Sequence, residues 1–342
     1  MSDWQFVRRV LIVVAIGALA AAIYALANLL LVIFAAVLCC IALRTLMAPL
    51  VRATSMPEPL ALAVVVVLIV AVSAGLVLQF GSKLSDQIAY LAQNAPQALH
   101  KLSESFDLGA VSGQVGGSAI GALAAGALTV GSSIAGAVAG FVLVLIGGIY
   151  LAASPQLYRR GAMVLVPKHW QSVVSSTLDD SGFALGRWLY AQGIAMVVIG
   201  VLTGVGMWVA GVPSPLALGL IAGATEFIPI VGPIVGAIPA LLLASTLGWD
   251  TTLAALAVAI AVQQIENNLV MPFVVGRVVE LPAAVGMFAT VAMGLLFGPL
   301  ELLLGYPLAI VADVAIRRLY VRETLGKPVE IPAERQRKAE GD

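Results

Sequence analysis

Two groups of polar residues lie inside segments that are apolar enough to enter lipid. Glu226 is followed shortly by Pro229, Gly232 and Pro233. The second group places five hydrogen-bonding side chains close together: Gln263, Gln264, Glu266, Asn267 and Asn268. A charged side chain at the centre of a bilayer costs at least ~2.5–3.5 kcal/mol on insertion scales, so a retained one marks a candidate functional site. We therefore expect both groups to lie on a solute or ion pathway.

Glu226 stands at the C-terminal end of an apolar segment that is predicted to be helical. The negative end of the helix dipole disfavours a carboxylate there, so we expect Glu226 to carry a proton unless a cation or a hydrogen-bond donor lies close. A structural role is the alternative, in which a protonated Glu226 hydrogen-bonds backbone groups freed around Pro229 and Pro233. The functional role is favoured because acids at membrane depth are functional by default.

The second group is predicted to form a polar wall near the end of the helix Thr251–Leu269. At about 3.6 residues per turn, Gln263, Glu266 and Asn267 share one helix face. The remaining two amides share a neighbouring face. Such amides offer donors and acceptors suited to a hydroxyl-rich solute. Hydrogen bonding between helices of an oligomer is the alternative, although it typically needs only one or two such residues.

Charged and nucleophilic residues elsewhere are few. Arg277 is the cation nearest in sequence to the second group, where it either pairs with the glutamate or anchors the topology. Asp313 is expected to pair with Arg317 one helical turn later. The two histidines, His100 and His169, fall in predicted surface segments, and no hydrolase, zinc-protease or phosphate-loop motif is present. No enzyme, cofactor or metal site is therefore expected.

The composition is that of a polytopic membrane protein. Of 342 residues, 61% are hydrophobic and 11% charged, with a mean hydropathy of +1.04, whereas soluble domains carry about 25% charged residues. The formal net charge is zero, and no long basic run suggests nucleic acid. Cys39 and Cys40 are adjacent in an apolar segment, which favours buried thiols over a disulfide or a metal site.

Residues 211–249 are predicted to form a re-entrant helical hairpin. Its arms, Pro215–Glu226 and Pro233–Leu247, would reach about 18 Å and about 22 Å, short of a ~30 Å hydrocarbon core. The two prolines oppose a continuous helix, so the turn is expected at Ile228–Gly232. Non-helical backbone at membrane depth needs protein or a water-filled cavity around it. The hairpin should therefore line a cavity.

The remaining apolar runs predict an all-α protein of about eight transmembrane helices plus the hairpin. The expected spans are Val10–Ala27, Leu29–Leu43, Leu60–Phe80, one closing near Tyr150–Ala153, Gln192–Ala210, Thr251–Leu269, and two in Pro282–Ile316 interrupted at Phe297–Glu301. The predicted divisions are an N-terminal two-span hairpin with a cytoplasmic loop at 1–59, the third and fourth spans at 60–153, a cytoplasmic helical elbow at 154–191, a transport core at 192–316 and a cytoplasmic tail at 317–342. Beyond Lys327 the tail is expected to lack structure.

An outer segment, 81–133, separates the third and fourth spans. Its first part is polar and amphipathic, which predicts helices that lie on the outer face of the membrane. Small residues then recur at every fourth position: Gly113, Gly117 and Gly121, and later Ser132, Gly136 and Gly140. This spacing favours close helix packing in lipid, and a flexible Gly/Ser linker is the alternative for its first half.

Orientation follows from the distribution of Lys and Arg. The expected topology leaves sixteen of the eighteen on the inner side and only Lys83 and Lys101 outside. This bias satisfies the positive-inside rule. Both termini are therefore expected in the cytoplasm of a bacterial-type inner membrane.

Three stretches resemble the autoinducer-2 exporter family of permeases. GLIAGATEFIPIVGPIVGAIPA (219–240) and QQIENNLVMPFVVGRVVELPA (263–283) are similar to two family signatures, and LVPKHWQSVVSSTLDDSGFALGRWLYAQ (165–192) resembles the cytoplasmic elbow. The resemblance implies an eight-span permease with a long outer segment. It also implies export of the quorum-sensing signal, as assigned to some members, or exchange of sodium or lithium for protons, as assigned to others. The chain departs from the family at Gly109–Gly140, where a more charged, Leu-rich segment is expected.

Two functions from different classes stay open. The favoured one is export of a small polar solute such as autoinducer-2, coupled to protons through Glu226, because the amide wall suits a solute. The other is a monovalent cation/proton antiporter or ion-conducting oligomer in which Glu226 and Glu266 titrate. A membrane scaffold is a weaker third. In each case the expected partners are the lipid bilayer and further copies of the chain in a homo-oligomer.

The topology predicts a labelling pattern. In a background lacking Cys39 and Cys40, Ser103→Cys should react with a membrane-impermeant thiol reagent from outside. Ser2→Cys and Gly341→Cys should react only when the cytoplasmic face is exposed. Labelling of position 103 from the cytoplasmic side alone would overturn this map.

Overall fold

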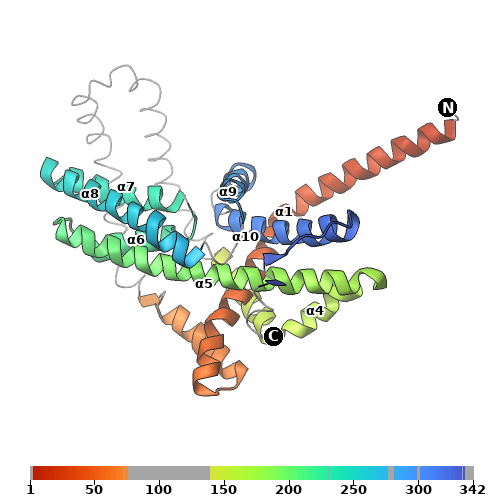
Figure 1. Cartoon of the computed structure of the whole chain (residues 1–342), viewed down its shortest axis with the longest axis horizontal. Coiled ribbons are helices and arrows are strands. Elements are labelled where there is room, and N and C mark those ends of the chain that lie inside the picture. The colour runs from red at the N-terminus through yellow and green to blue at the C-terminus, as the bar shows by residue number, and fades with distance from the viewer. Residues whose placement is uncertain are drawn as a thin grey trace.

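The computed structural model describes residues 3–72, 74–75, 139–229, 231–275, 281–298, 301–332 and 334–335, and all secondary structure in these residues is helical. The labelled elements are α1 (Asp3–Thr54), α4 (Pro155–Val164), η2 (Lys168–Trp170), α5 (Gln171–Val209), α6 (Pro215–Thr225), α7 (Val231–Ser245), α8 (Trp249–Ile265), η3 (Glu266–Val275), α9 (Ala283–Phe297), α10 (Leu302–Ala315) and η4 (Ile316–Thr324) (Figure 1). The all-α class is therefore confirmed.

Three helices of the described part are long and apolar enough to cross a membrane: Ala25–Thr54, Lys168–Val209 and Trp249–Val270. A fourth span results if Ala139–Ala153 and α4, bent by 89° at Ser154, count as one. Shorter apolar helices, α6 and α7 among them, accompany these spans. The total of about eight spans stays a prediction.

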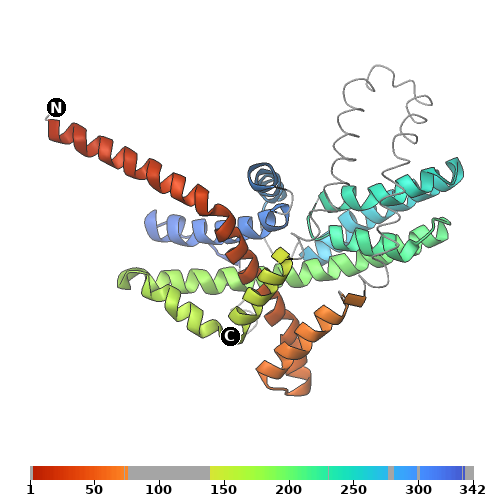
Figure 2. The same ribbon diagram turned by 180° about the vertical axis from the view of Figure 1, so that it is seen from behind.

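The N-terminal region differs from the expected two-span hairpin. The structure has one continuous helix, α1, where a break at Asn28 and a loop from Arg44 were expected. A single Asn lowers helix propensity by less than about 0.7 kcal/mol, so it does not end a strongly apolar helix. Pro49 also lies within α1, and the loop shrinks to a short connection at Ser55, whose φ is 52°. The first half of α1 extends away from the other helices in both ribbon views (Figures 1 and 2).

The end of α1 packs against the helices Glu58–Val72 and Ala139–Ala153. Leu43, Met47, Ala61 and Ala152 are buried in the shared core. A Cβ added to Gly148 would lie 2.7 Å from the Cys39 Sγ, so glycine permits this contact. Of the glycines predicted to pack helices, Gly140 is exposed and has no described atom within 4 Å of an added Cβ. The others, Gly113, Gly117, Gly121 and Gly136, lie outside the described residues, as does segment 81–133.

α5 is the helix around which the rest is arranged. It joins the expected elbow and the expected fifth span without a break, and it contacts α1, α6, α8, η3, α10 and η4. Figures 1 and 2 show it running through the centre of the molecule, with α6, α7 and α8 along one half and α10 along the other. Elements from the N-terminal and the C-terminal parts of the chain therefore pack against this one long helix.

The contact between α5 and α6 is made by glycines. An added Cβ on Gly219 would lie 2.9 Å from the Cα of Gly204, and one on Gly223 would lie 3.1 Å from the Cα of Gly200. Each helix thus presents two glycines four residues apart, the spacing that brings backbones together in lipid. Close packing by small residues therefore occurs here, in a pair of segments where it was not expected.

The C-terminal segment is more ordered than expected. Ile331 is 2% exposed and packs with Leu185, Trp188 and Ile310 in one core cluster. The π-helical η4 continues α10 past the predicted end of the span. Burial of one Ile side chain contributes roughly 1.5–3 kcal/mol, which explains how a Pro-containing, charged tail keeps a fixed position to this point.

Ion pairs hold the same segment. Arg318 pairs with Asp180 of α5, which is fully buried, and also lies 3.7 Å from the Glu334 carboxylate. Arg322 pairs with Glu334 at 2.9 Å. The predicted pair of Asp313 and Arg317 is confirmed, with Nε and Oδ2 2.8 Å apart. Losing one partner of a buried pair typically costs 3–5 kcal/mol, so the Asp180 contact fixes the end of η4 on α5.

The glycine contact predicts a stability difference between two conservative changes. Gly219→Ala should destabilise the protein by about 1–3 kcal/mol, because overpacking forces the α5 and α6 backbones apart. Gly193→Ala on α5 is the matched control, since its added Cβ meets nothing within 4 Å, and it should be neutral or slightly stabilising. Thermal unfolding of the purified protein in detergent checks both. Equal midpoints would show that the helices do not depend on this contact.

Candidate functional site

The hairpin is built as two short helices joined by a turn. α6 ends at Thr225, Glu226 is its C-cap, and α7 begins at Val231. Backbone bonds close the turn, from Ile228 N to Thr225 O at 3.0 Å and from Gly232 N to Ile228 O at 2.8 Å. The turn between α6 and α7 therefore begins at Glu226, two residues before the predicted Ile228–Gly232, and its described part satisfies much of its own backbone.

Glycine and proline positions determine how the arms meet. An added Cβ on Gly232 would overlap the Thr225 carbonyl, and one on Gly236 would lie 3.0 Å from the Cα of Ala222. Pro229 is buried in the turn. Pro233 lies in the first turn of α7, where a missing N–H costs little. Of the predicted turn residues, Gly232 thus permits the close approach and Pro229 shapes the reversal.

Glu226 is fully buried. Neither of its carboxyl oxygens has a hydrogen-bond partner among the described residues. Its backbone carbonyl accepts a bond of 2.5 Å from the Gln192 side chain of α5, which satisfies one of the carbonyls left open at the α6 C-terminus. The expected alternative, in which the Glu226 side chain caps turn backbone groups, has no such bond in the described part.

Gln192 is a site residue that the sequence analysis missed. It is 1% exposed, and its Oε1, like the two Glu226 oxygens, makes no hydrogen bond to a described residue. The sequence feature that marks it is a single amide side chain at the start of the apolar run predicted as the fifth span. That signal is weak, because only the packing of α5 on the turn gives Gln192 its partner.

Glu266 approaches Glu226 from a different helix. It is 2% exposed, and Gln263 donates a hydrogen bond to its Oε2 at 2.9 Å. The carboxyl groups of Glu226 and Glu266 lie close enough to interact directly. Glu266 also begins the π-helical η3, and π-helical turns inside helices are frequent at functional sites. Two predicted groups are thus brought together at one point.

A cavity of about 30 Å³ lies beside this pair. It is lined by Thr203 of α5, Ala222 of α6, Pro233 and Gly236 of α7, and Gln263 and Glu266. A cavity of this size has room for about one water molecule. The hairpin therefore lines a small space between α5, α6, α7 and α8.

The predicted polar wall is divided by the fold. Gln263 and Glu266 face the cavity, whereas Gln264, Asn267 and Asn268 are exposed. The expected shared face of Glu266 and Asn267 is wrong, because neighbouring residues of a helix point about 100° apart and the interior side of this helix includes Glu266 but not Asn267. Hydrogen bonding between helices remains the alternative role of the exposed amides. Arg277 lies outside the described residues.

An aromatic cluster packs against the turn between α6 and α7. Trp188 is fully buried, edge-on to Phe227 with ring centroids 5.5 Å apart and stacked on Tyr306 at 5.6 Å. Such pairs contribute about 0.5–1.5 kcal/mol beyond their buried area. Trp188 thus joins α5, the turn and α10. No group of three or more His, Cys, Asp or Glu side chains among the described residues could hold a metal ion.

Comparison with known proteins gives one family match. Residues 11–320 match the model of AI-2E family transporters. This range includes the hairpin, the acid pair and the predicted elbow.

Individual relatives match over shorter lengths. "Putative transport protein YrrI" of Bacillus subtilis is 36% identical over 165 residues, covering 48% of this chain and 47% of the relative. "Putative transport protein MT0215" of Mycobacterium tuberculosis is 32% identical over 193 residues, covering 54% and 51%. "AI-2 transport protein TqsA" of Escherichia coli is 24% identical over 184 residues, covering 52% and 51%. The chain spans about half the length of the curated relatives it matches.

The family match extends over far more than half of the chain and agrees with its helical, apolar architecture. The chain therefore belongs to the AI-2E family of transporters, a family of multi-pass membrane proteins and not of enzymes.

Proposed function

We propose that the chain exports a small polar solute across the bacterial inner membrane, coupled to protons through Glu226 and Glu266. The observation that carries this proposal is the meeting of two buried carboxyl groups at the turn of a broken helix, beside a cavity. The family match supports transport as the activity.

The acid pair suits proton transfer. Two carboxylates that face each other away from water repel strongly, so at least one of them must hold a proton. Gln263 donates to Glu266, which favours the charged form there and leaves Glu226 as the group that holds the proton. Binding or release of a proton at Glu226 would then change the charge at the turn itself.

Transport requires the hairpin to move. The cavity of about 30 Å³ is too small for a solute, so the described arrangement corresponds to a closed pathway. α7 contributes Pro233 and Gly236 to one wall, opposite Gln263. Displacement of the short α6–α7 hairpin relative to α8 would enlarge this space and expose the acid pair.

The solute class follows from the groups that would face it. Thr203 and Gln263 offer a hydroxyl and an amide in an otherwise apolar lining, and together they donate and accept hydrogen bonds. A hydroxyl-rich signal molecule of the kind named for TqsA fits this chemistry.

Exchange of a monovalent cation for protons is the second candidate. The unpartnered buried atoms at the turn are acceptors: both Glu226 carboxyl oxygens and the Gln192 Oε1. Hard cations prefer oxygen ligands, and a carboxyl that loses its proton as a cation arrives supplies the coupling. Measuring solute and sodium movement in the same reconstituted vesicles separates this candidate from solute export.

Glu226→Gln tests the coupling role. The variant keeps the size of the side chain and a hydrogen-bonding capacity but can no longer release a proton, so proton-driven uptake into inverted vesicles should fall to background. Equilibration of solute down its own gradient should survive. Glu330→Gln is the matched control, because the Glu330 side chain is 85% exposed, and its flux should equal that of the wild type.

A purely structural Glu226 predicts a different result. Loss of one hydrogen bond changes stability by only about 1 kcal/mol, so Glu226→Gln would then keep wild-type flux and pH dependence. That outcome, at equal protein level in the vesicles, would remove Glu226 from the coupling mechanism.

Gln263→Leu tests the solute contact against Asn267→Leu. Gln263 lines the cavity and Asn267 is exposed, so only Gln263→Leu should raise the solute concentration for half-maximal flux, by about tenfold for one to two lost hydrogen bonds. Flux assays over a range of signal-molecule concentrations give this value. A larger effect of Asn267→Leu would place the solute on the exposed amides instead.

A further inference from the structure

α4 is a short helix with an unusual environment. It leaves the apolar helix Ala139–Ala153 at an angle of 89°, and none of its ten residues is buried. Apolar side chains near it face outward, with Leu157 68%, Val164 80% and Leu165 86% exposed. If the preceding helix crosses a bilayer, a helix at a right angle to it lies in the plane of the membrane surface.

The sequence of α4 and of the segment after it carries only basic charges up to Asp179. Between Ser154 and Leu178 the sequence has Arg159, Arg160 and Lys168 and no Asp or Glu. Arg159 is engaged by Asp179 at 2.6 Å and by Ser175 at 2.7 Å. Arg160 and Lys168 are exposed and make no ion pair with a described residue. Two positive charges are therefore left without counterions on this surface.

An open groove lies between α4 and the start of α5. It has a volume of about 540 Å³ and is lined by Gln156, Arg159, Arg160, Met163, Val164 and Gln171. Gln171 donates to the carbonyl oxygens of Met163 and Val166, at 3.2 and 3.1 Å. These bonds tie the end of α4 to α5 and maintain the shape of the groove. Its volume falls in the range of small-molecule sites, about 300–1,000 Å³.

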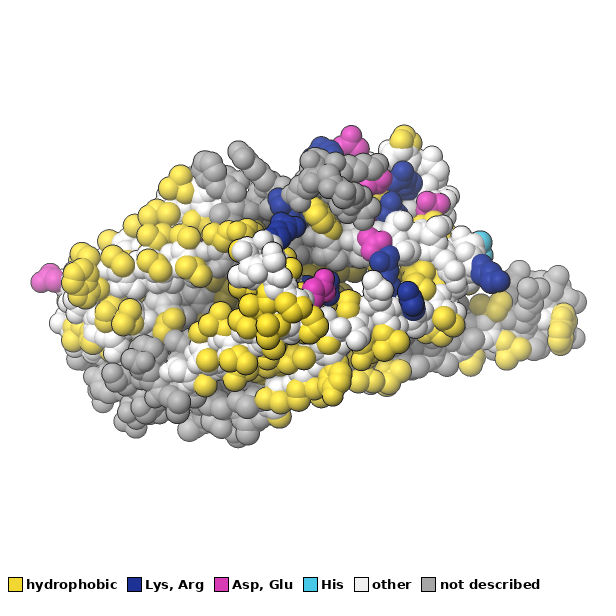
Figure 3. Space-filling model, turned by 90° about the horizontal axis from the view of Figure 1, so that it is seen from below, with side chains coloured by type: hydrophobic (Ala, Val, Ile, Leu, Met, Phe, Trp, Pro, Cys, Tyr) yellow, Lys and Arg dark blue, Asp and Glu magenta, His cyan; other side chains and the backbone are white. Residues whose placement is uncertain are grey.

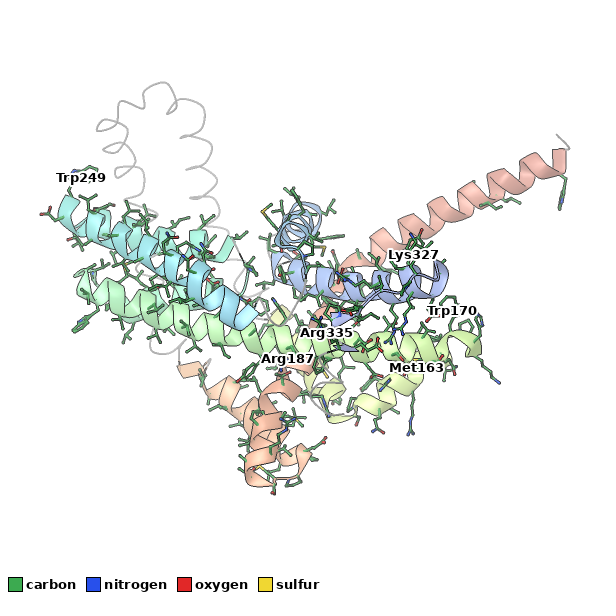
Figure 4. All side chains as sticks on the ribbon, viewed as in Figure 1. Met163, Trp170, Arg187, Trp249, Lys327 and Arg335 are labelled. Atoms are coloured by element: carbon green, nitrogen blue, oxygen red, sulfur yellow. The ribbon has the colours of Figure 1, made fainter. Side chains whose placement is uncertain are left out.

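The figures show how this surface is placed. Lys and Arg side chains gather in one part of the face seen in Figure 3, interspersed with Asp and Glu, while hydrophobic side chains cover much of the rest of the coloured surface. Figure 4 places Met163 and Trp170 at the end of the molecule away from Trp249. The groove thus lies at the charged end of α5, and its rim combines basic and exposed apolar side chains.

We propose that this surface binds an anionic phospholipid: α4 lies in the headgroup layer, Arg160 contacts the lipid phosphate in the groove, and Val164 and Leu165 enter the acyl region. A lipid satisfies both features at once, because its phosphate neutralises the basic groups and its chains cover the apolar ones. An acidic soluble partner would neutralise Arg160 but leave Leu157, Val164 and Leu165 in water. This binding site is separate from the acid pair and goes beyond the proposed transport.

Lipid retention by the full chain tests the site. The protein is reconstituted in vesicles of equal phosphatidylglycerol and phosphatidylcholine, extracted in mild detergent, and its bound lipids are counted by native mass spectrometry. The wild type should retain phosphatidylglycerol preferentially. Arg160→Gln should weaken that binding by about fivefold, the effect of one basic residue near an anionic surface. Its thermal midpoint should not change, because Arg160 makes no ion pair with any residue that the structure describes.

Arg52→Gln is the matched control. Arg52 is also exposed, in the last turn of α1, and its loss should leave phosphatidylglycerol retention at the wild-type level. Equal retention of the two lipids by the wild type, or equal loss in both variants, would overturn the proposal. Binding of an acidic peptide that depends on Arg160, without lipid preference, would assign the surface to a protein partner instead.

Depth measurement provides a second readout. A spin label on Leu165→Cys, in a background lacking Cys39 and Cys40, should be more accessible to oxygen than to a water-soluble nickel reagent in vesicles. A label on Gly161→Cys of the same helix provides the comparison. The label at position 165 can also be compared with the same label on a free peptide in water. Equal accessibility to the nickel reagent in both samples would show that α4 does not enter the membrane.

Discussion

The close contact between α5 and α6 is the constraint on which the rest of the described structure depends. Gly200 and Gly204 of α5 meet Gly219 and Gly223 of α6, and a Cβ added to either α6 glycine would overlap the α5 backbone. In lipid, helices gain nothing from excluding water from one another, so close van der Waals packing has to hold them together. This contact brings the end of α6 against α5 at Gln192, where the Glu226 carbonyl is bonded. The position of the acid therefore follows from four glycines.

α5 also connects the candidate site to the opposite end of the chain. Trp188 contacts Phe227 in the turn and Tyr306 in α10, and Asp180, on the same helix, binds Arg318 of η4. Ile331 completes the core around Trp188. A packed cluster with few rotamer alternatives transmits displacement rather than absorbing it. Motion of the hairpin turn would thus displace α10 and the described part of the tail.

Burial of the acid pair costs free energy, and this cost limits the roles that the pair can have. Each buried carboxyl loses its hydration, and neither Glu226 oxygen recovers a hydrogen bond among the described residues. A site needed only for stability would be filled more favourably by apolar side chains. The meeting of two buried acids, one at the α6–α7 turn and one at the start of η3, therefore supports the proposed proton or cation coupling.

The sequence by itself determined the helical class, the broken hairpin and both polar groups, because each depends on local properties: apolar length, proline at membrane depth and charge in an apolar run. Only the tertiary structure decided which of those residues meet. Gln192 gained its role through packing on the turn, and the packing of α8 and η3 against their neighbours buried Glu266 and left Asn267 outside. The continuity of α1 and the burial of Ile331 were likewise decided by contacts between distant segments. Periodicity gives the face of a regular helix, but it cannot supply the neighbour that makes one face interior, nor anticipate a local change of helix geometry.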